Sequence, residues 1–385
     1  NTTISGNKAN NGAGISNTAP SITITGSTIT GNTAINNGGG ISNDGTGGIA
    51  GPMTITNTTI SSNTATNGFG GGISNTGTVT ISTSTISGNK SNGQGGGIRN
   101  DSRYGGNFFF TVTDSTISGN SASDGGGIRN GGSLALSNTT ISGNTATSNG
   151  GGIWNDSRYG NGGTQTLTNV TIASNSANSG GAFYNVGGKV NIYNSILADS
   201  TKGDDFTGTQ PTNSSDNIIT SGTMNGSITV TSAQLNLGKL QNNGGSTPTM
   251  AFGADSAAFG TGNATISNAS PVNALDQRGV ARSSTTPSIG AFEYVPPIAS
   301  QLGLTINASG SVNGLAFTTQ PVITLQDSFG ATAGTNNSPV TMTVSSGATT
   351  LGTTTVNAVN GVATFTNVGI TGIVGTSYTL TFASS

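Results

Sequence analysis

The chain has 385 residues, of which only 6% are charged, and its formal net charge is −2. Without a basic cluster it offers no electrostatic footprint for nucleic acid and no polybasic membrane patch, so neither partner is expected. Cysteine and histidine are absent, which excludes disulfides, thiolate metal sites and histidine acid–base chemistry. No apolar run approaches the roughly 18 residues of a membrane helix, so no membrane-spanning segment is expected.

The first half of the chain repeats a phrase close to T-I-S-G-N followed by G-G-G-I-x-N. Two short apolar anchors in every 20 to 30 or so residues, separated by Gly and Asn, predict a right-handed parallel β-helix. The first anchor falls at Ile4, Ile29, Ile60, Ile86, Ile117, Ile141, Ile172 and, in degenerate form, Ile196. The second anchor falls at Ile15, Ile41, Ile73, Ile98, Ile128, Ile153 and Phe183.

Within each coil the alternation of a strand places the Ile inward and its Thr or Ser neighbours outward. Short strands such as Leu134–Leu136 and Val190–Ile192 supply a third wall. An Asn follows each anchor where the chain turns, as at Asn89 and Asn100. Equivalent Asn side chains in successive coils can hydrogen-bond to one another, so we expect amide ladders with a structural role.

Successive first anchors are alternately 24 to 26 and 31 residues apart. The extra length begins just after Asn43, Asn100 and Asn155, so loops are inserted at one corner of every second coil. Two of these loops open with the same sequence, N-D-S-R-Y-G. They predict a ridge that serves either as a partner-binding surface or as a subunit contact. The alternative is that an Asp–Arg pair merely orders each long loop. The ridge residues are Asp101, Arg103, Tyr104, Asp156, Arg158 and Tyr159.

After residue 199 the repeat decays. Residues 200–294 are expected to hold irregular last coils and a cap, with strands at Asn217–Ile219, Ile228–Val230 and Leu235–Leu237. Residues 295–299 read as a linker. Residues 300–385 alternate in the antiparallel manner and predict a small immunoglobulin-like β-sandwich. Its expected strands are Val322–Leu325, Val340–Val344, Val362–Phe365 and Tyr378–Phe382.

Three stretches resemble known families. The run Ile141-Ser-Gly-Asn144 with Gly150-Gly-Gly-Ile153 resembles the repeat of bacterial polymorphic outer-membrane proteins, over roughly residues 1–199. The motifs N-N-G-G-S-T-P-T (242–249), S-P-V (270–272), D-Q-R-G (276–279) and I-G-A-F-E (289–293) resemble the choice-of-anchor Q domain. The motifs F-T-T-Q-P (317–321) and V-N-G-V-A-T-F (359–365) are similar to bacterial immunoglobulin-like repeats.

These resemblances imply an extracellular or cell-surface module of a large bacterial protein. The polymorphic family ends in a membrane-inserted β-barrel, which is not found in this sequence, so anchoring by that route is not implied. The resemblance names no ligand.

The variable residue of G-G-G-I-x-N is the sharpest surface signal. In register, Arg99, Arg129, Trp154 and Tyr184 would form one outward strip about 15 Å long. Such a strip could stack on sugar rings or anchor a protein partner. The alternative is a solvated ladder that gains only from contacts between Arg and aromatic rings.

Carboxylates are too scattered to favour catalysis. Polysaccharide-cleaving β-helices need clustered acids, whereas Glu293 is the only Glu and most Asp residues lie in turns. Asp199, Asp204 and Asp205 form the one local cluster and are weak candidates for calcium. Asp276, Arg278 and Glu293 are expected to form a buried or semi-buried ion pair that fixes the cap.

The sequence therefore predicts an extracellular structural or adhesive protein that is not an enzyme: a rigid rod of a bacterial surface protein or filament. It would act by self-association or adhesion, with its own subunits, other surface proteins or glycans as partners. The alternative is a secreted carbohydrate-binding or polysaccharide-cleaving β-helix protein.

Overall fold

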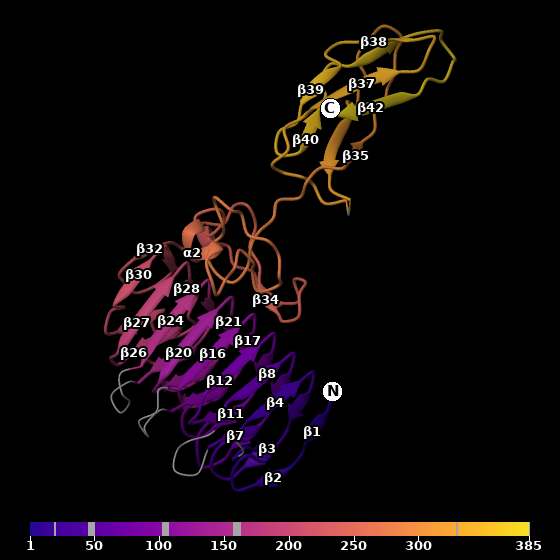
Figure 1. Ribbon diagram of the computed structural model, residues 1–385. Helices are drawn as coiled ribbons and strands as arrows, with labels where there is room; N and C mark the ends of the chain where they lie inside the picture. Colours follow the sequence, from indigo (N-terminus) through magenta and orange to yellow (C-terminus); the bar gives the residue numbers. More distant parts are fainter. Residues whose placement is uncertain (19–20, 45–50, 102–107, 157–162, 329, 385) are drawn as a thin grey trace. The chain divides into compact units, whose positions relative to one another are not determined.

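The structure is a computed structural model and describes residues 1–18, 21–44, 51–101, 108–156, 163–328 and 330–384. The chain divides into two compact units, Asn1–Tyr294 and Val295–Ser385. The predicted all-β class is confirmed, with long parallel sheets in the first unit and small antiparallel sheets in the second (Figure 1).

The first unit is a parallel β-helix whose coils pass through sheets A, B, C and D in turn (Figure 1). Sheet A holds the first anchors, in strands β1 (Thr3–Ser5), β5 (Thr28–Thr30), β9 (Thr59–Ser61), β13 (Thr85–Ser87), β17 (Thr116–Ser118), β21 (Thr140–Ser142), β25 (Thr171–Ala173), β28 (Ile196–Ala198), β31 (Asn217–Ile219) and β32 (Ser227–Thr229). Sheet C holds the second anchors, in β3 (Ile15–Ser16), β7 (Ile41–Asn43), β11 (Ile73–Asn75), β15 (Ile98–Asn100), β19 (Ile128–Asn130), β23 (Ile153–Asn155), β26 (Phe183–Asn185) and β29 (Phe206–Gly208).

Sheet D is the expected third wall, but a short additional sheet, B, lies between A and C. Sheet D contains β4 (Ile22–Thr25), β8 (Met53–Thr56), β12 (Val79–Ser82), β16 (Phe109–Thr113), β20 (Ser133–Ser137), β24 (Thr164–Thr168), β27 (Lys189–Tyr193) and β30 (Asn213–Ser215). Sheet B contains β2 (Lys8–Ala9), β6 (Thr33–Ala34), β10 (Thr64–Ala65), β14 (Lys90–Ser91), β18 (Ser121–Asp124) and β22 (Thr145–Asn149). Four of its six strands are only two residues long, and such short runs show no alternation in the sequence.

The anchors pair in register and form one continuous core. Ile4, Ile29 and Ile60 stack through sheet A, and from Ile29 onward the side chains are fully buried. The glycines before each second anchor allow neighbouring coils to approach closely. A Cβ atom at Gly71 or Gly72 would collide with the backbone of the next coil.

The predicted asparagine ladders are confirmed. In the first ladder, each side-chain amide donates to the side-chain oxygen of the Asn one coil further on, at 2.9–3.0 Å. Its members are Asn7, Asn32, Asn63, Asn89, Asn120, Asn144 and Asn175. A second ladder follows sheet C from Asn17 to Asn130 and resumes between Asn155 and Asn185.

Residues 230–294 pack against the outward face of sheet A from β17 to β31, instead of closing the end of the helix alone. We call this segment the cap. It contains α1 (Ser232–Leu235), α2 (Ala264–Asn268) and a hairpin of β33 (Leu240–Gln241) and β34 (Thr249–Met250). The strand expected at Leu235–Leu237 is wrong, because Thr231 and Gln234 form a capping box that starts a short helix there.

The cap binds sheet A through an apolar cluster. Its Leu235, Phe252 and Phe292 pack with Ala173, Ile196, Ala198 and Ile218, which point outward from β25, β28 and β31. The outward Ser of the repeat is replaced by Ala in β25 and β28, and the outward Thr is replaced by Ile in β28 and β31. The apolar part of the cap contact therefore lies where the sheet surface becomes apolar.

The second unit pairs its strands antiparallel. One sheet contains β35 (Gln301–Ile306), β36 (Val322–Gln326) and β40 (Val362–Thr364), and another contains β39 (Thr355–Asn357), β37 (Pro339–Val344) and β42 (Leu380–Ser384). A two-stranded sheet joins β38 (Thr349–Leu351) and β41 (Gly369–Thr371). A separate core forms around Phe317, Leu325, Met342 and Phe365.

Candidate functional site: a buried charged ladder on sheet C

The residues predicted to form the outward strip do stack in register on sheet C. Arg99 of β15 pairs with Arg129 of β19, which pairs with Trp154 of β23, which pairs with Tyr184 of β26. The expected exposure is wrong for three of them. Arg99 is 7% exposed, Arg129 is 2% exposed and Trp154 is 5% exposed, whereas Tyr184 is half-buried.

Acidic residues at the start of the inserted loops lie beside the strip. Asp101 and Asp156 follow the strands directly and are each 2% exposed. Arg99 forms an ion pair with Asp101. The Arg129 guanidinium lies between both carboxylates, with nitrogen–oxygen distances of 3.5 Å to Asp101 and 3.6 Å to Asp156. The charges thus neutralise one another beneath the surface instead of facing solvent.

Aromatic rings complete the enclosure of the two guanidinium groups. The guanidinium carbon of Arg99 lies 4.8 Å from the ring centre of Phe69, and that of Arg129 lies 5.7 Å from the ring centre of Trp154. Arg129 also donates to the backbone oxygen of Asn100 at 3.4 Å. We refer to Arg99, Asp101, Arg129, Trp154 and Asp156 as the charged ladder. Of the two aromatic rings in the strip, Trp154 is buried and Tyr184 is half-buried.

The same arrangement begins one unit earlier with serine in place of arginine. The Ser42 hydroxyl donates to Asp44 at 2.7 Å, and the Ser74 hydroxyl donates to the same carboxylate at 3.5 Å. Arg99 donates to the Ser74 hydroxyl at 3.4 Å, which joins the two sets. One carboxylate at each inserted loop therefore ties that loop to the strip.

The loop ridge is only partly described. Asp101 and Asp156 belong to the charged ladder and do not project. Arg103, Tyr104, Arg158 and Tyr159 lie outside the described residues, so the ridge remains a prediction.

The acidic cluster after the repeat is used in hydrogen bonding. The Asp205 carboxylate is buried and accepts bonds from the backbone N–H groups of Ser200, Thr220 and Ser221 and from the Thr220 hydroxyl. The Asp199 carboxylate accepts from the Ser232 hydroxyl. No group of three or more His, Cys, Asp or Glu side chains is placed to hold a metal among the residues that the structure describes.

The cap contains two ion pairs. Arg278 pairs with Asp276 at 2.7 Å, but the Glu293 carboxylate pairs with Arg282, at 3.4 Å, and Glu293 offers Arg278 only its backbone oxygen. Burial lowers the pKa of Arg282 to about 10, against the opposing effect of Glu293. Sequence reasoning missed Arg282, although two Arg and two acids within residues 276–293 already allow a second pair.

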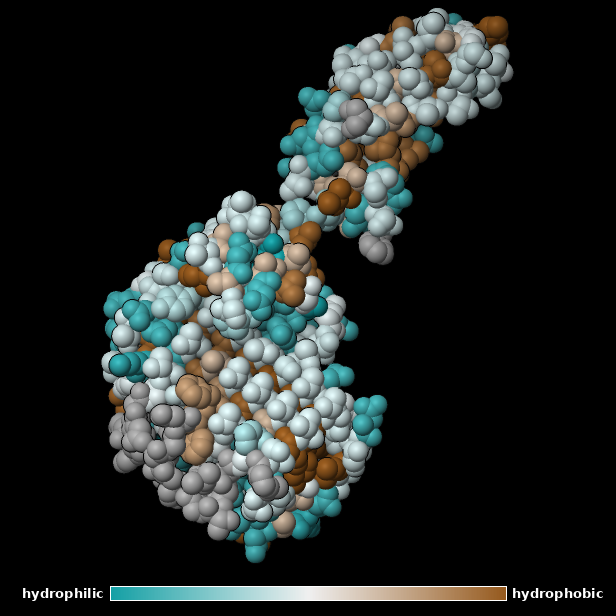
Figure 2. Space-filling model, viewed as in Figure 1, coloured by the Kyte–Doolittle hydropathy of each residue, from teal (hydrophilic) through white to brown (hydrophobic). Residues whose placement is uncertain are grey.

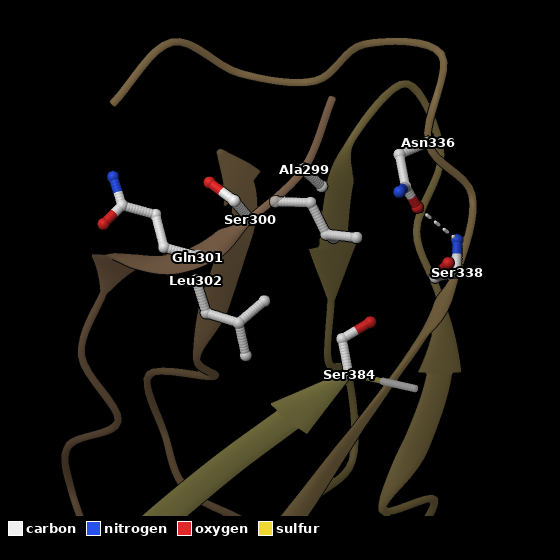
Figure 3. Close-up of a pocket in the computed structure, with 8 residues that line it drawn as sticks. Ala299, Ser300, Gln301, Leu302, Asn336, Ser338 and Ser384 are labelled. Carbon is white, nitrogen blue, oxygen red and sulfur yellow. Dashed lines mark hydrogen bonds between the residues drawn. The ribbon is translucent and has the colours of Figure 1, made fainter. Parts of the chain in front are cut away.

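The second unit holds a pocket of about 290 Å³ beside the start of β35 and the end of β42 (Figure 3). Leu302 and Leu325 supply its apolar lining. Two of its polar side chains are already engaged, since Asn336 accepts from the Ser338 N–H at 2.8 Å and the Ser384 hydroxyl donates to the Pro339 carbonyl. The pocket therefore offers few directed groups to a ligand.

Comparison with known proteins gives one family match. Residues 138–156 match the Chlamydia polymorphic membrane protein (Chlamydia_PMP) repeat. This segment includes β21, β22 and β23, with Trp154 and Asp156 of the charged ladder near its end. No curated protein and no solved structure matches the chain. The repeat points to an outer-membrane or surface protein. No helix of the described chain is long and apolar enough to cross a membrane.

Proposed function

We propose that this chain is a rigid β-helical rod of an extracellular bacterial surface protein or filament, and that it acts by self-association or adhesion. The observation that carries the proposal is the first asparagine ladder. Interior members such as Asn89 are fully buried and form side-chain bonds with both neighbouring coils. Side chains repeated in every coil are thus used to hold the coils together.

The charged ladder supports the same role. It links sheet C to the loops of alternate coils through buried ion pairs, and breaking one such pair leaves an uncompensated buried charge. Only 6% of the residues in the chain are charged, and much of the face of the helix seen in Figure 2 is near white, the colour of intermediate hydropathy. A stiff rod with few charges suits a spacer or contact element on a cell surface.

The proposal includes the absence of enzymatic activity. The carboxylates of Asp205 and Glu293 are engaged in structural hydrogen bonds, with Glu293 accepting from Ser288 and Ser283 N–H groups in addition to its ion pair. Groups held in this way are poor candidates for proton transfer to a substrate.

Adhesion can be tested with beads coated with the full chain and with beads coated with an unrelated protein of similar charge. We expect only the chain-coated beads to aggregate with one another or to bind cell surfaces. Equal behaviour of both bead types would refute the proposal. In parallel, incubation with a panel of neutral and anionic polysaccharides should release no products, and product release would establish an enzyme instead.

A further inference from the structure

The cap forms hydrogen bonds with a row of threonines on the outward face of sheet A. Thr116 donates to the Pro248 carbonyl at 2.6 Å, Thr140 donates to the Gln277 side-chain oxygen at 2.6 Å, and Thr171 accepts from the Ala291 N–H at 3.0 Å. These three hydroxyls occupy one register position on β17, β21 and β25. They bind backbone groups and a carboxamide, which are the polar groups of an uncharged polypeptide segment.

Asparagines in the turn before each strand reinforce this contact. Asn138 and Asn194 adopt left-handed backbone conformations and donate their side-chain amides to the cap carbonyls of Leu275 and Asn263, at 3.0 and 2.9 Å. In one coil the turn asparagine and the strand threonine that bind the cap, Asn138 and Thr140, are separated by one residue. Asn169 and Thr171 repeat the pair in the next coil, with Asn169 bonded to the Gly290 carbonyl at 3.5 Å.

The same row continues beyond the cap without a cover. Thr28, Thr59 and Thr85 are in register with Thr116 through β5, β9, β13 and β17, and all three are half-buried where Thr116 is fully buried. Their hydroxyls have no hydrogen-bond partner in the described parts of the chain. Asn57 precedes Thr59 by the same spacing, has a φ of 49° against 44° for Asn138, and is exposed.

We propose that this uncovered row, Thr28, Asn57, Thr59 and Thr85, is a docking surface for an extended, uncharged segment of a second copy of this chain. The inference rests on the proposed self-associating function and names its contact surface. Continuity with the cap interface supports the proposal, because the same residue types at the same register positions of neighbouring coils already bind the cap within one molecule.

The size and charge of the surface select this occupant. Strands about 4.8 Å apart and three residues long give a patch of roughly 15 Å by 10 Å, far below the ~800 Å² per partner of a globular interface. A single extended segment of about five residues fits it. None of the outward residues of β5, β9 and β13 is charged, and only 6% of the whole chain is charged, so a second copy is rich in suitable segments.

A contact of this size is weak in isolation. We expect a dissociation constant on the order of 0.1–1 mM for the free chain, which becomes effective when many copies share a surface. Sedimentation equilibrium of the full chain between 10 μM and 2 mM or so covers this range.

The matched variants place two lysines on either face. Thr59→Lys with Thr85→Lys alters the row, whereas Thr54→Lys with Thr80→Lys alters exposed outward positions of sheet D and adds the same charge. We expect the first variant to lose self-association at least tenfold and the second to retain it, with circular dichroism unchanged in both. A wild-type chain that stays monomeric, or an equal loss in both variants, would overturn the inference.

A second measurement uses the absence of cysteine in the chain. A nitroxide attached to Thr59→Cys should become immobilised as the concentration rises, and one attached to Thr54→Cys should not. Equal mobility of the two labels at every concentration would also count against the inference. If beads coated with the chain adhere to cells while the chain remains monomeric, this inference fails and the proposed adhesive function stands.

Discussion

Removal of one interior amide from the first asparagine ladder should weaken the whole β-helix. Asn89 is fully buried, and its side chain donates to the Ile60 carbonyl and to Asn120, both at 2.9 Å. Its side-chain oxygen accepts the backbone and side-chain N–H groups of Asn63, both at 3.0 Å. At about 1 kcal/mol for each of these four bonds, Asn89→Ala should cost about 4 kcal/mol. This is a large share of a typical unfolding free energy of roughly 5–15 kcal/mol.

The matched control is the same substitution at the exposed end of the ladder. Asn7 is exposed, and its side chain forms one bond, to Asn32 at 2.9 Å. Asn7→Ala should therefore cost at most about 1 kcal/mol. Urea unfolding followed by circular dichroism gives the two free energies. Hydrogen exchange shows whether the coils around Asn89 open locally, as repeat proteins can. Equal losses in the two variants, or a loss below about 1.5 kcal/mol for Asn89→Ala, would refute the reasoning.

Three further predictions follow from buried polar groups. Gln165 lies in the core between Leu134 and Val190, is fully buried, and has both side-chain amide atoms unpaired among the described residues. Gln165→Leu should therefore raise the free energy of unfolding, measured by urea titration, by about 1–3 kcal/mol. A lower free energy of unfolding would show that the amide has a hydrogen-bond partner. Burial raises the pKa of Asp114, because the charged carboxylate is disfavoured in the folded state. Asp114→Asn should therefore have a higher melting temperature than wild type at pH 7, and this difference should shrink as the pH falls through the raised pKa toward the unfolded value of about 3.9. A difference that stays constant with pH would contradict this prediction. Arg278→Ala leaves the buried Asp276 carboxylate without its guanidinium partner. Hydrogen exchange should therefore quicken across residues 240–294, by the equivalent of about 3 kcal/mol of lost stability, while exchange in β1 to β13 stays unchanged. Unchanged protection of the cap would exclude this role for Arg278.

The architecture of the first unit could be predicted because one repeat determines both inward and outward positions. Once Ile29 is placed above Ile60, the stacking of Asn32 on Asn63 and of Arg99 on Arg129 follows from the constant spacing. Periodicity carries no such information about sheet B, because four of its six strands are only two residues long and too short to alternate. The helix α1 forms because Thr231 and Gln234 make a capping box, whereas the apolar spacing of Leu235 and Leu237 favours a strand.

The candidate site could be located from the sequence, but its burial could not. An outward position on a strand predicts exposure only if nothing folds over it, and here Asp101 and Asp156, at the start of the inserted loops, are buried with the arginines and pair with them. The repeated N-D that opens each inserted loop was visible, and each Asp lies two residues after an outward strip position, close enough to meet Arg99. Pairing an outward Arg with an Asp on the next outward position would have predicted the ion pair.

On sheet A, by contrast, the outward residue types of a strand match the kind of contact that the cap makes with it. Its outward row is Thr at β5, β9 and β13, remains Thr under the edge of the cap at β17, β21 and β25, and becomes Ile at β28 and β31. The hydroxyls serve polar contacts with cap backbone and the Ile side chains serve an apolar cluster, so one row changes its chemistry with its partner. Threonine on the uncovered strands then matches the polar part of that interface. For this reason the search for a partner should begin with extended, carboxamide-bearing polypeptide at Thr59 and its neighbours, before it turns to the buried Trp154.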